Sequence, residues 1–128
     1  MVRTLVLWGA VLGLASVGLG AFGAHALRER LSSESMTIYQ TGVQYQMAHA
    51  LALIGLAALG DRIRLTLVAG WLFVFGVSLF SGSLYLLAIT GQGWLGAVTP
   101  LGGLCFLAGW ATVVIGAARS SGDRAESS

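Results

Sequence analysis

The chain has 128 residues, of which 56% are hydrophobic and only 9% are charged. Soluble domains carry about 25% charged residues, so this chain cannot cover itself with a polar surface. Its formal net charge of +2 results from seven arginines and five Asp and Glu residues. The arginines are spread along the sequence, which argues against a nucleic-acid interface. The composition therefore predicts a single compact unit with the lipid bilayer as its main surroundings.

The first uncharged run follows Arg3 and extends from Thr4 to Ala24. A basic residue before an apolar run is also typical of a secretory signal peptide, and Ala24-His25-Ala26 resembles a cleavage site. Signal peptides have an apolar region of about 7 to 15 residues, whereas this run is longer and contains several glycines. We therefore favour a membrane helix that is not cleaved.

Residues 27–46 have a mixed composition, with charged residues, a serine cluster and apolar residues at helical spacing. This pattern predicts a short amphipathic helix at the membrane surface. A second span is expected from about Thr41 to Gly60, because Asp61-Arg62-Ile63-Arg64 then forms a charged turn.

Residues 65–118 contain no Asp, Glu, Lys or Arg. A bilayer core about 30 Å thick is crossed by roughly 20 apolar residues, so this run holds two spans. Gly91-Gln92-Gly93 marks the turn between them, and Pro100 begins the second. We expect an all-α, polytopic protein with one four-helix transmembrane domain at 1–118, the surface helix between its first two spans, and a disordered polar tail at 119–128.

The arginines predict an orientation for these spans. One side of the membrane would hold five of them and the other side two; the five are Arg3, Arg62, Arg64, Arg119 and Arg124. Cytoplasmic segments are enriched in Lys and Arg. Both termini are therefore expected in the cytoplasm, with the chain as a multi-pass protein of the inner (plasma) membrane.

Four segments occur in one order: Gly20-Ala21-Phe22-Gly23-Ala24-His25, Tyr45-Gln46-Met47-Ala48-His49-Ala50-Leu51, Leu79-Phe80-Ser81-Gly82-Ser83-Leu84-Tyr85 and Thr99-Pro100-Leu101-Gly102-Gly103. Together they resemble the YgdD-like family of small inner-membrane proteins of unknown function, which has relatives in mitochondria. The resemblance covers roughly residues 3–118. It implies a four-helix membrane protein, and it implies no reaction, substrate or catalytic residue.

Several polar residues lie at similar counted depths in the predicted spans. At 1.5 Å per residue from the cytoplasmic turns, His49 lies at about 18 Å, Gln46 and Ser78 at about 21 to 22 Å, and Gln44 at about 25 Å. The predicted polar layer comprises Ser16, Gln44, Gln46, His49, Ser78, Ser81 and Tyr85. We interpret it as hydrogen bonding between helices. The alternatives are a wet cavity or proton path at His49, or metal or haem ligation by His49.

Small residues recur at helical spacing on the first and fourth spans, and such faces allow close helix packing in lipid. The predicted packing residues are Gly9, Gly13, Gly20, Gly109 and Gly116. These faces either bind partner proteins or meet inside the monomer, and the sequence leaves both open. The first hypothesis for function is a helix-packing accessory subunit or homo-oligomeric membrane component.

A small transporter or pore, with the polar layer around His49, is the alternative function. An enzyme is not expected, because the predicted spans contain no nucleophile beside a base, no paired carboxylates and no set of three metal ligands. No catalytic, cofactor-binding or metal-binding residue is therefore predicted. The partners expected are the lipid bilayer and either further copies or a larger membrane complex, without nucleic acid.

Overall fold

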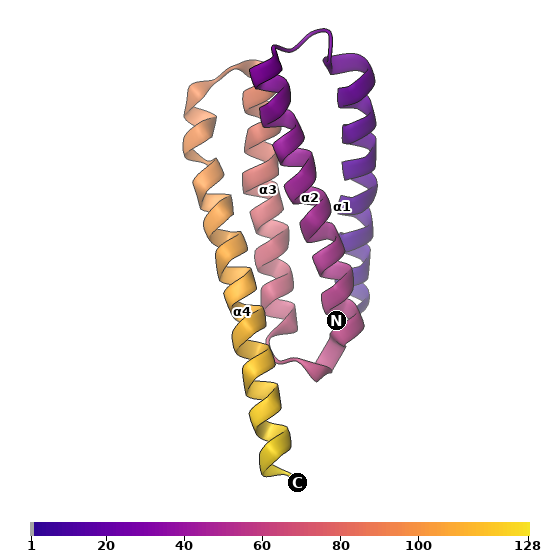
Figure 1. The fold of residues 1–128 in the computed structure, drawn as a ribbon, viewed down its shortest axis with the longest axis vertical. Coiled ribbons are helices and arrows are strands. Elements are labelled where there is room, and N and C mark those ends of the chain that lie inside the picture. Colours follow the sequence, from indigo (N-terminus) through magenta and orange to yellow (C-terminus); the bar gives the residue numbers. More distant parts are fainter. Residues whose placement is uncertain (1) are drawn as a thin grey trace.

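The computed structural model describes residues 2–128, which form four long helices joined by short connections (Figure 1). The long helices are α1 (Val2–Phe22), α2 (Ser33–Leu59), α3 (Thr66–Thr90) and α4 (Thr99–Glu126). The short segments are the π-helical turn η1 (Gly23–Leu27) and the 3-10 turns η2 (Gly60–Arg62) and η3 (Gly93–Ala97). Each long helix is long and apolar enough to cross a membrane. The predicted all-α, four-span architecture is confirmed.

The four helices lie in a row that follows their order in the chain (Figure 1). α1 packs against α2, α2 against α3, and α3 against α4, so α1 and α4 occupy the two ends of the row. Both termini lie at the same end of the molecule. The sharp reversals use residues with positive φ: Gly60 and Leu65 between α2 and α3, and Gly91 at the predicted turn after α3.

The prediction of a separate amphipathic helix between the first two spans is wrong. Ser32 accepts a hydrogen bond from the backbone N–H of Ser35 at 3.1 Å, and α2 then runs without interruption to Leu59. Tyr39 explains the continuity, because its side chain is 1% exposed and its hydroxyl donates to the carbonyl of Leu19 on α1 at 2.6 Å. The beginning of α2 is therefore held against α1 and does not lie apart on the membrane surface.

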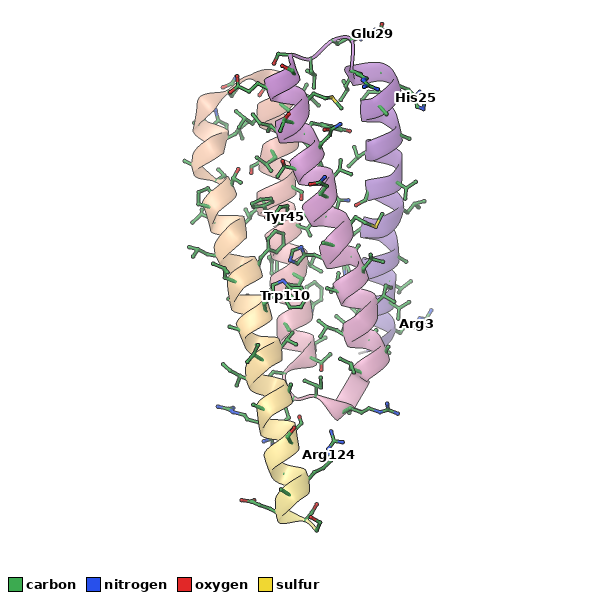
Figure 2. All side chains as sticks on the ribbon, viewed as in Figure 1. Arg3, His25, Glu29, Tyr45, Trp110 and Arg124 are labelled. Carbon is green, nitrogen blue, oxygen red and sulfur yellow. The ribbon has the colours of Figure 1, made fainter. Side chains whose placement is uncertain are left out.

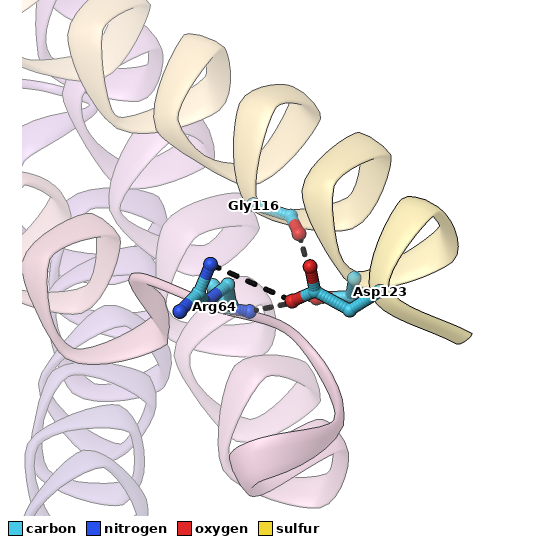
Figure 3. Close-up of polar contacts among 4 residues, drawn as sticks. Arg64, Gly116 and Asp123 are labelled. Atoms are coloured by element: carbon cyan, nitrogen blue, oxygen red, sulfur yellow. Dashed lines mark hydrogen bonds and ion pairs between the residues drawn. The ribbon is translucent and has the colours of Figure 1, made fainter. Parts of the chain in front are cut away.

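The polar residues 119–126 form the last turns of α4, where the sequence predicts a disordered tail at 119–128. Figure 3 shows the contacts beside this extension. The Ser120 hydroxyl accepts from the backbone N–H of Arg64 at 3.1 Å and donates to the carbonyl of Gly116 at 2.8 Å. Arg64 also forms an exposed ion pair with Asp123 at 3.5 Å. These contacts join α4 to the connection before α3, which composition alone does not reveal.

The buried side chains form two clusters along the row. The larger one joins all four helices in the half nearer the termini, and the smaller one joins α1, α2 and α3 at the opposite end. Phe73 and Leu53 are fully buried in the larger cluster, and Tyr39 is buried in the smaller one. Of the predicted polar residues, Ser16 lies on α1 and the others lie on α2 and α3.

Candidate functional site

Gln46 on α2 connects three helices. Its Nε2 donates to the carbonyl of Leu12 on α1 at 2.9 Å, and its Oε1 accepts from the hydroxyl of Tyr85 on α3 at 2.7 Å. The side chain is only 4% exposed, so an apolar environment surrounds both bonds. An unsatisfied amide is costly in such surroundings, and this arrangement uses both ends of the carboxamide.

Ser81 makes a second bond between α2 and α3. Its hydroxyl donates to the carbonyl of Gly42 at 2.7 Å, and the side chain is fully buried. A Cβ on Gly42 would lie 2.7 Å from Cε1 of Tyr85. Glycine at this position therefore lets α3 approach α2 closely enough for the serine to reach the backbone.

His49 on α2 is buried among aromatic side chains of α2, α3 and α4. Two of these neighbours, Tyr45 and Trp110, are labelled in Figure 2. The His49 ring stacks on Phe106, with centroids 3.7 Å apart and an interplanar angle of 9°, and it meets the ring of Phe73 edge-on at 5.0 Å. Nδ1 lies 2.7 Å from the carbonyl of Tyr45, and Nε2 lies 3.1 Å from the indole nitrogen of Trp110.

These contacts determine the protonation of the imidazole. An indole N–H can only donate, so Nε2 of His49 must accept from Trp110 and carries no proton. Nδ1 then carries the proton and donates to Tyr45. Both nitrogens of the neutral ring are occupied, which leaves neither one free to bind a metal or to pass a proton in this arrangement.

The remaining predicted polar residues do not join this network. Gln44 is exposed at the edge of an open pocket of about 330 Å³ between α1 and α2. Ser78 is exposed and donates to the carbonyl of Val74 in its own helix at 2.9 Å. Ser16 is buried on α1, and its hydroxyl has no hydrogen-bond partner among residues 2–128. The seven predicted polar residues therefore do not form a single layer, because residues at the same depth can point to different sides of their helices.

Three interhelical contacts lie outside the predicted set. Trp110 binds His49, Tyr39 binds the carbonyl of Leu19, and the hydroxyls of Ser83 and Thr99 lie 2.6 Å apart. Trp, Tyr, Ser and Thr are all common in membrane helices. The hydrogen-bond partner of each of these residues can be identified only once it is known which helices pack together. The sequence signal that favours packing around His49 is the set of aromatic residues in α3, which are Trp71, Phe73, Phe75, Phe80 and Tyr85.

The predicted glycine faces lie inside the molecule. On α1, a Cβ at Gly9 would lie 2.8 Å from Cδ1 of Ile54 on α2, and Gly13 and Gly20 also face α2. On α4, a Cβ at Gly109 would lie 2.5 Å from Cε1 of Phe73, and Gly116 lies against the carbonyl of Arg64. The first face meets α2, and the second meets α3 and the connection before it, so both faces are already used within one chain.

The structure keeps the two histidines apart. His25 is exposed at the end opposite the termini (Figure 2), whereas His49 is buried near the middle of α2. Among residues 2–128, no group of three or more His, Cys, Asp or Glu side chains is placed to hold a metal ion.

Residues 19–103 match the family model described as "Protein of unknown function (DUF423)". The chain belongs to this family. It is 44% identical over 120 residues to the UPF0382 membrane protein YwdK of Bacillus subtilis, a match that covers 91% of this chain and 98% of the relative. The UPF0382 inner membrane protein YgdD of Escherichia coli K12 is also 44% identical over 120 residues, with 91% of each chain covered.

A third relative is the UPF0382 membrane protein SH2409 of Staphylococcus haemolyticus, which is 45% identical over 114 residues. That match covers 88% of this chain and 93% of the relative. No solved structure matches. The resemblance to the YgdD-like family is confirmed, and this family member is an integral membrane protein of unknown function.

Proposed function

We propose that this protein is a packing component of a membrane assembly, which associates with further membrane polypeptides through the exposed side of α2. The observation that carries the proposal is the composition of that side. Seven exposed residues at steps of three and four form the α2 outer face: Thr37, Gln40, Gln44, Ala48, Leu51, Gly55 and Ala58. Most of them are small or polar, as at helix interfaces within membranes.

The exposed sides of the end helices differ from this face. α1 exposes large aliphatic side chains such as Val11, Leu14 and Val17, and α4 exposes Leu107 and Val114. Large apolar side chains suit contact with lipid tails, so these two sides need no protein partner when lipid covers them. The α2 outer face has only Leu51 of this kind, at 64% exposure.

The two glutamines of the α2 outer face lack partners. Gln40 and Gln44 form no side-chain hydrogen bond with any of residues 2–128. Counted from Asp61, Gln44 lies at about 25 Å and Gln40 at about 31 Å, so Gln44 falls within a hydrocarbon core about 30 Å thick. Lipid tails offer no hydrogen bonds, whereas a neighbouring polypeptide can supply them.

The internal hydrogen bonds support packing over the alternative of a transporter or pore. A solute path needs polar groups that face an open space. Gln46, Ser81 and His49 instead bond to neighbouring helices or to backbone carbonyls. The carboxylates lie near the ends of the helices. Asp61, Asp123 and Glu126 lie at one end of the molecule, and Glu29 and Glu34 lie at the other, which also supports the proposal that the chain is not an enzyme.

Two matched glycine substitutions test the proposal. Gly55 on the α2 outer face and Gly18 on α1 are both exposed, and a Cβ at either position would meet nothing within 4 Å. Gly55→Leu adds bulk where a partner is expected, and Gly18→Leu makes the same change on a side that faces lipid. Native membranes would be extracted directly into polymer nanodiscs, and the particles measured by native mass spectrometry.

We expect the natural chain and Gly18→Leu to carry further polypeptides in a fixed ratio, and Gly55→Leu to lose them while remaining folded. If the natural chain is found as a single copy with lipid alone, the proposal is overturned. Equal loss of partners in both variants would show that the α2 outer face is not the contact.

A further inference from the structure

We propose that the partner on the α2 outer face is a second copy of this chain, so that two α2 helices pack in parallel about a two-fold axis along the membrane normal. This inference rests on the proposed function and identifies its partner. It is carried by the self-complementary chemistry of Gln44 and by the spacing of the residues that follow it on the same face.

Insertion restricts the symmetry that two copies can adopt. The arginine distribution gives every copy the same orientation, because positively charged segments stay on the cytoplasmic side. Two copies in the same orientation can pair about an axis that is perpendicular to the bilayer. On that axis the two α2 helices run parallel, and each residue of the α2 outer face lies opposite its own counterpart at the same depth.

Gln44 suits this position. A carboxamide contains both a donor and an acceptor, so two glutamines across a two-fold axis can exchange two N–H···O hydrogen bonds. A charged residue opposite its own copy would repel it, and a hydroxyl could donate only one bond of the pair. The exposed side chain of Gln44, which lacks a partner within residues 2–128, thus gains one from an identical surface.

The rest of the face has the repeat of a parallel helix pair. Gln44, Leu51 and Ala58 recur every seven residues, with Ala48 and Gly55 between them. A seven-residue repeat keeps one side of a helix against its partner in a left-handed crossing. The small residues allow close approach, and one polar position in such a repeat fixes the register between the two helices.

Cysteine cross-linking in native membranes tests the pair directly. In a Cys105→Ser background, Ala48→Cys places a thiol on the α2 outer face at about 20 Å from the cytoplasmic turn, and Val17→Cys places one on the lipid-facing side of α1 at about 21 Å. Val17 is 63% exposed, so both thiols are accessible at matched depth. Two differently tagged copies would be expressed together and oxidised with a membrane-permeant copper complex.

We expect Ala48→Cys to yield a disulfide-linked product that carries both tags, and Val17→Cys to remain monomeric. Adding Gln44→Leu to Ala48→Cys should lower the yield by about threefold or more, the effect of losing an average interhelical hydrogen bond in a membrane. Equal yields from Ala48→Cys and Val17→Cys would indicate random collision and overturn the inference.

The remaining outcomes separate this inference from the proposed function. Cross-linking of Ala48→Cys to a different polypeptide, without the doubly tagged product, overturns the second copy and leaves association through α2 intact. A third outcome is that Ala48→Cys and Gly55→Cys both stay monomeric and Gln44→Cys reacts with a membrane-impermeant maleimide. Water in the open pocket between α1 and α2 would then form the hydrogen bonds of Gln40 and Gln44. That result overturns both proposals.

Discussion

At the scale of single residues, Trp110 decides which nitrogen of His49 carries the proton. The indole donates to Nε2, and the carbonyl of Tyr45 accepts from Nδ1. We predict that ¹⁵N solid-state NMR of the His25→Gln variant, in which His49 is the one histidine, shows a neutral ring protonated at Nδ1. Trp110→Phe removes the donor and should move the Nε2 resonance toward that of a free acceptor. A neutral ring with its proton on Nε2 would contradict the hydrogen bonds described for His49.

The bond between Tyr85 and Gln46 provides a measure of how much one interhelical contact stabilises the fold. Tyr85→Phe removes the hydroxyl that donates to Gln46 at 2.7 Å. We predict a loss of about 0.6 kcal/mol in the free energy of unfolding, and no more than about 2, as for other hydrogen bonds between membrane helices. Reversible unfolding in mixed micelles would measure it, with a double-mutant cycle against Gln46→Leu.

Tyr45→Phe is the matched control for that measurement, because the Tyr45 hydroxyl forms no hydrogen bond with residues 2–128 and the ring is 44% exposed. It should change stability by less than Tyr85→Phe. Equal effects of the two changes, or a coupling energy of zero in the cycle, would show that the buried bond contributes nothing.

Between elements, the close contact of α3 and α4 depends on glycine. A Cβ at Gly109 would lie 2.5 Å from Cε1 of Phe73, so the larger side chain of Gly109→Leu must push the two helices apart. We predict that this change lowers the free energy of unfolding by at least about 2 kcal/mol, as at other overpacked positions, so that the folded monomer is lost. The loss would be measured as aggregation or as a lowered unfolding midpoint in micelles. Gly18→Leu should leave the monomer folded. A stable Gly109→Leu monomer that only loses partners would place Gly109 on an outer surface.

The spans and their turns could be predicted from the sequence because they depend on local properties. A long uncharged run must be a helix in lipid, and Gly91 supplies the positive φ that reverses the chain after α3. The continuous start of α2 and the long end of α4 could not be predicted in this way. Polarity indicates contact with water, but it does not show that a bond such as Tyr39 to Leu19 holds the helix in place.

The candidate site could be predicted only in part, for a geometric reason. Depth follows from counting residues, so Gln44 and Gln46 appear equivalent in the sequence. They are two positions apart on a helix with 3.6 residues per turn, and therefore point in nearly opposite directions. Only the placement of α1 and α3 around α2 shows that Gln46 faces inward and Gln44 outward.

At the scale of the whole molecule, the common end of the two termini allows a test of orientation. Arg3 and Arg124 lie at that end (Figure 2). By the order of the elements, Arg62, Arg64 and Arg119 lie toward the same end, whereas Arg28 and Arg30 lie in the connection at the opposite end. We predict that a fluorescent protein fused after Ser128 is bright and that alkaline phosphatase fused there is inactive, because both report a cytoplasmic C-terminus. Fusions after Gly91 should give the reverse result. An active phosphatase after Ser128 would mean that the chain inserts with the opposite orientation.

The row of helices also affects how the chain assembles during synthesis. Each new helix finds its main packing surface on the helix made just before it, so α1 and α2 can pair before α3 is complete. Every pairing step closes only the short connection between two consecutive helices, and the entropy lost in closing a chain segment grows with its length. Synthesis from the N-terminus therefore follows the same order as the packing. Each inserted helix can pack on its neighbour in the sequence before later helices are made.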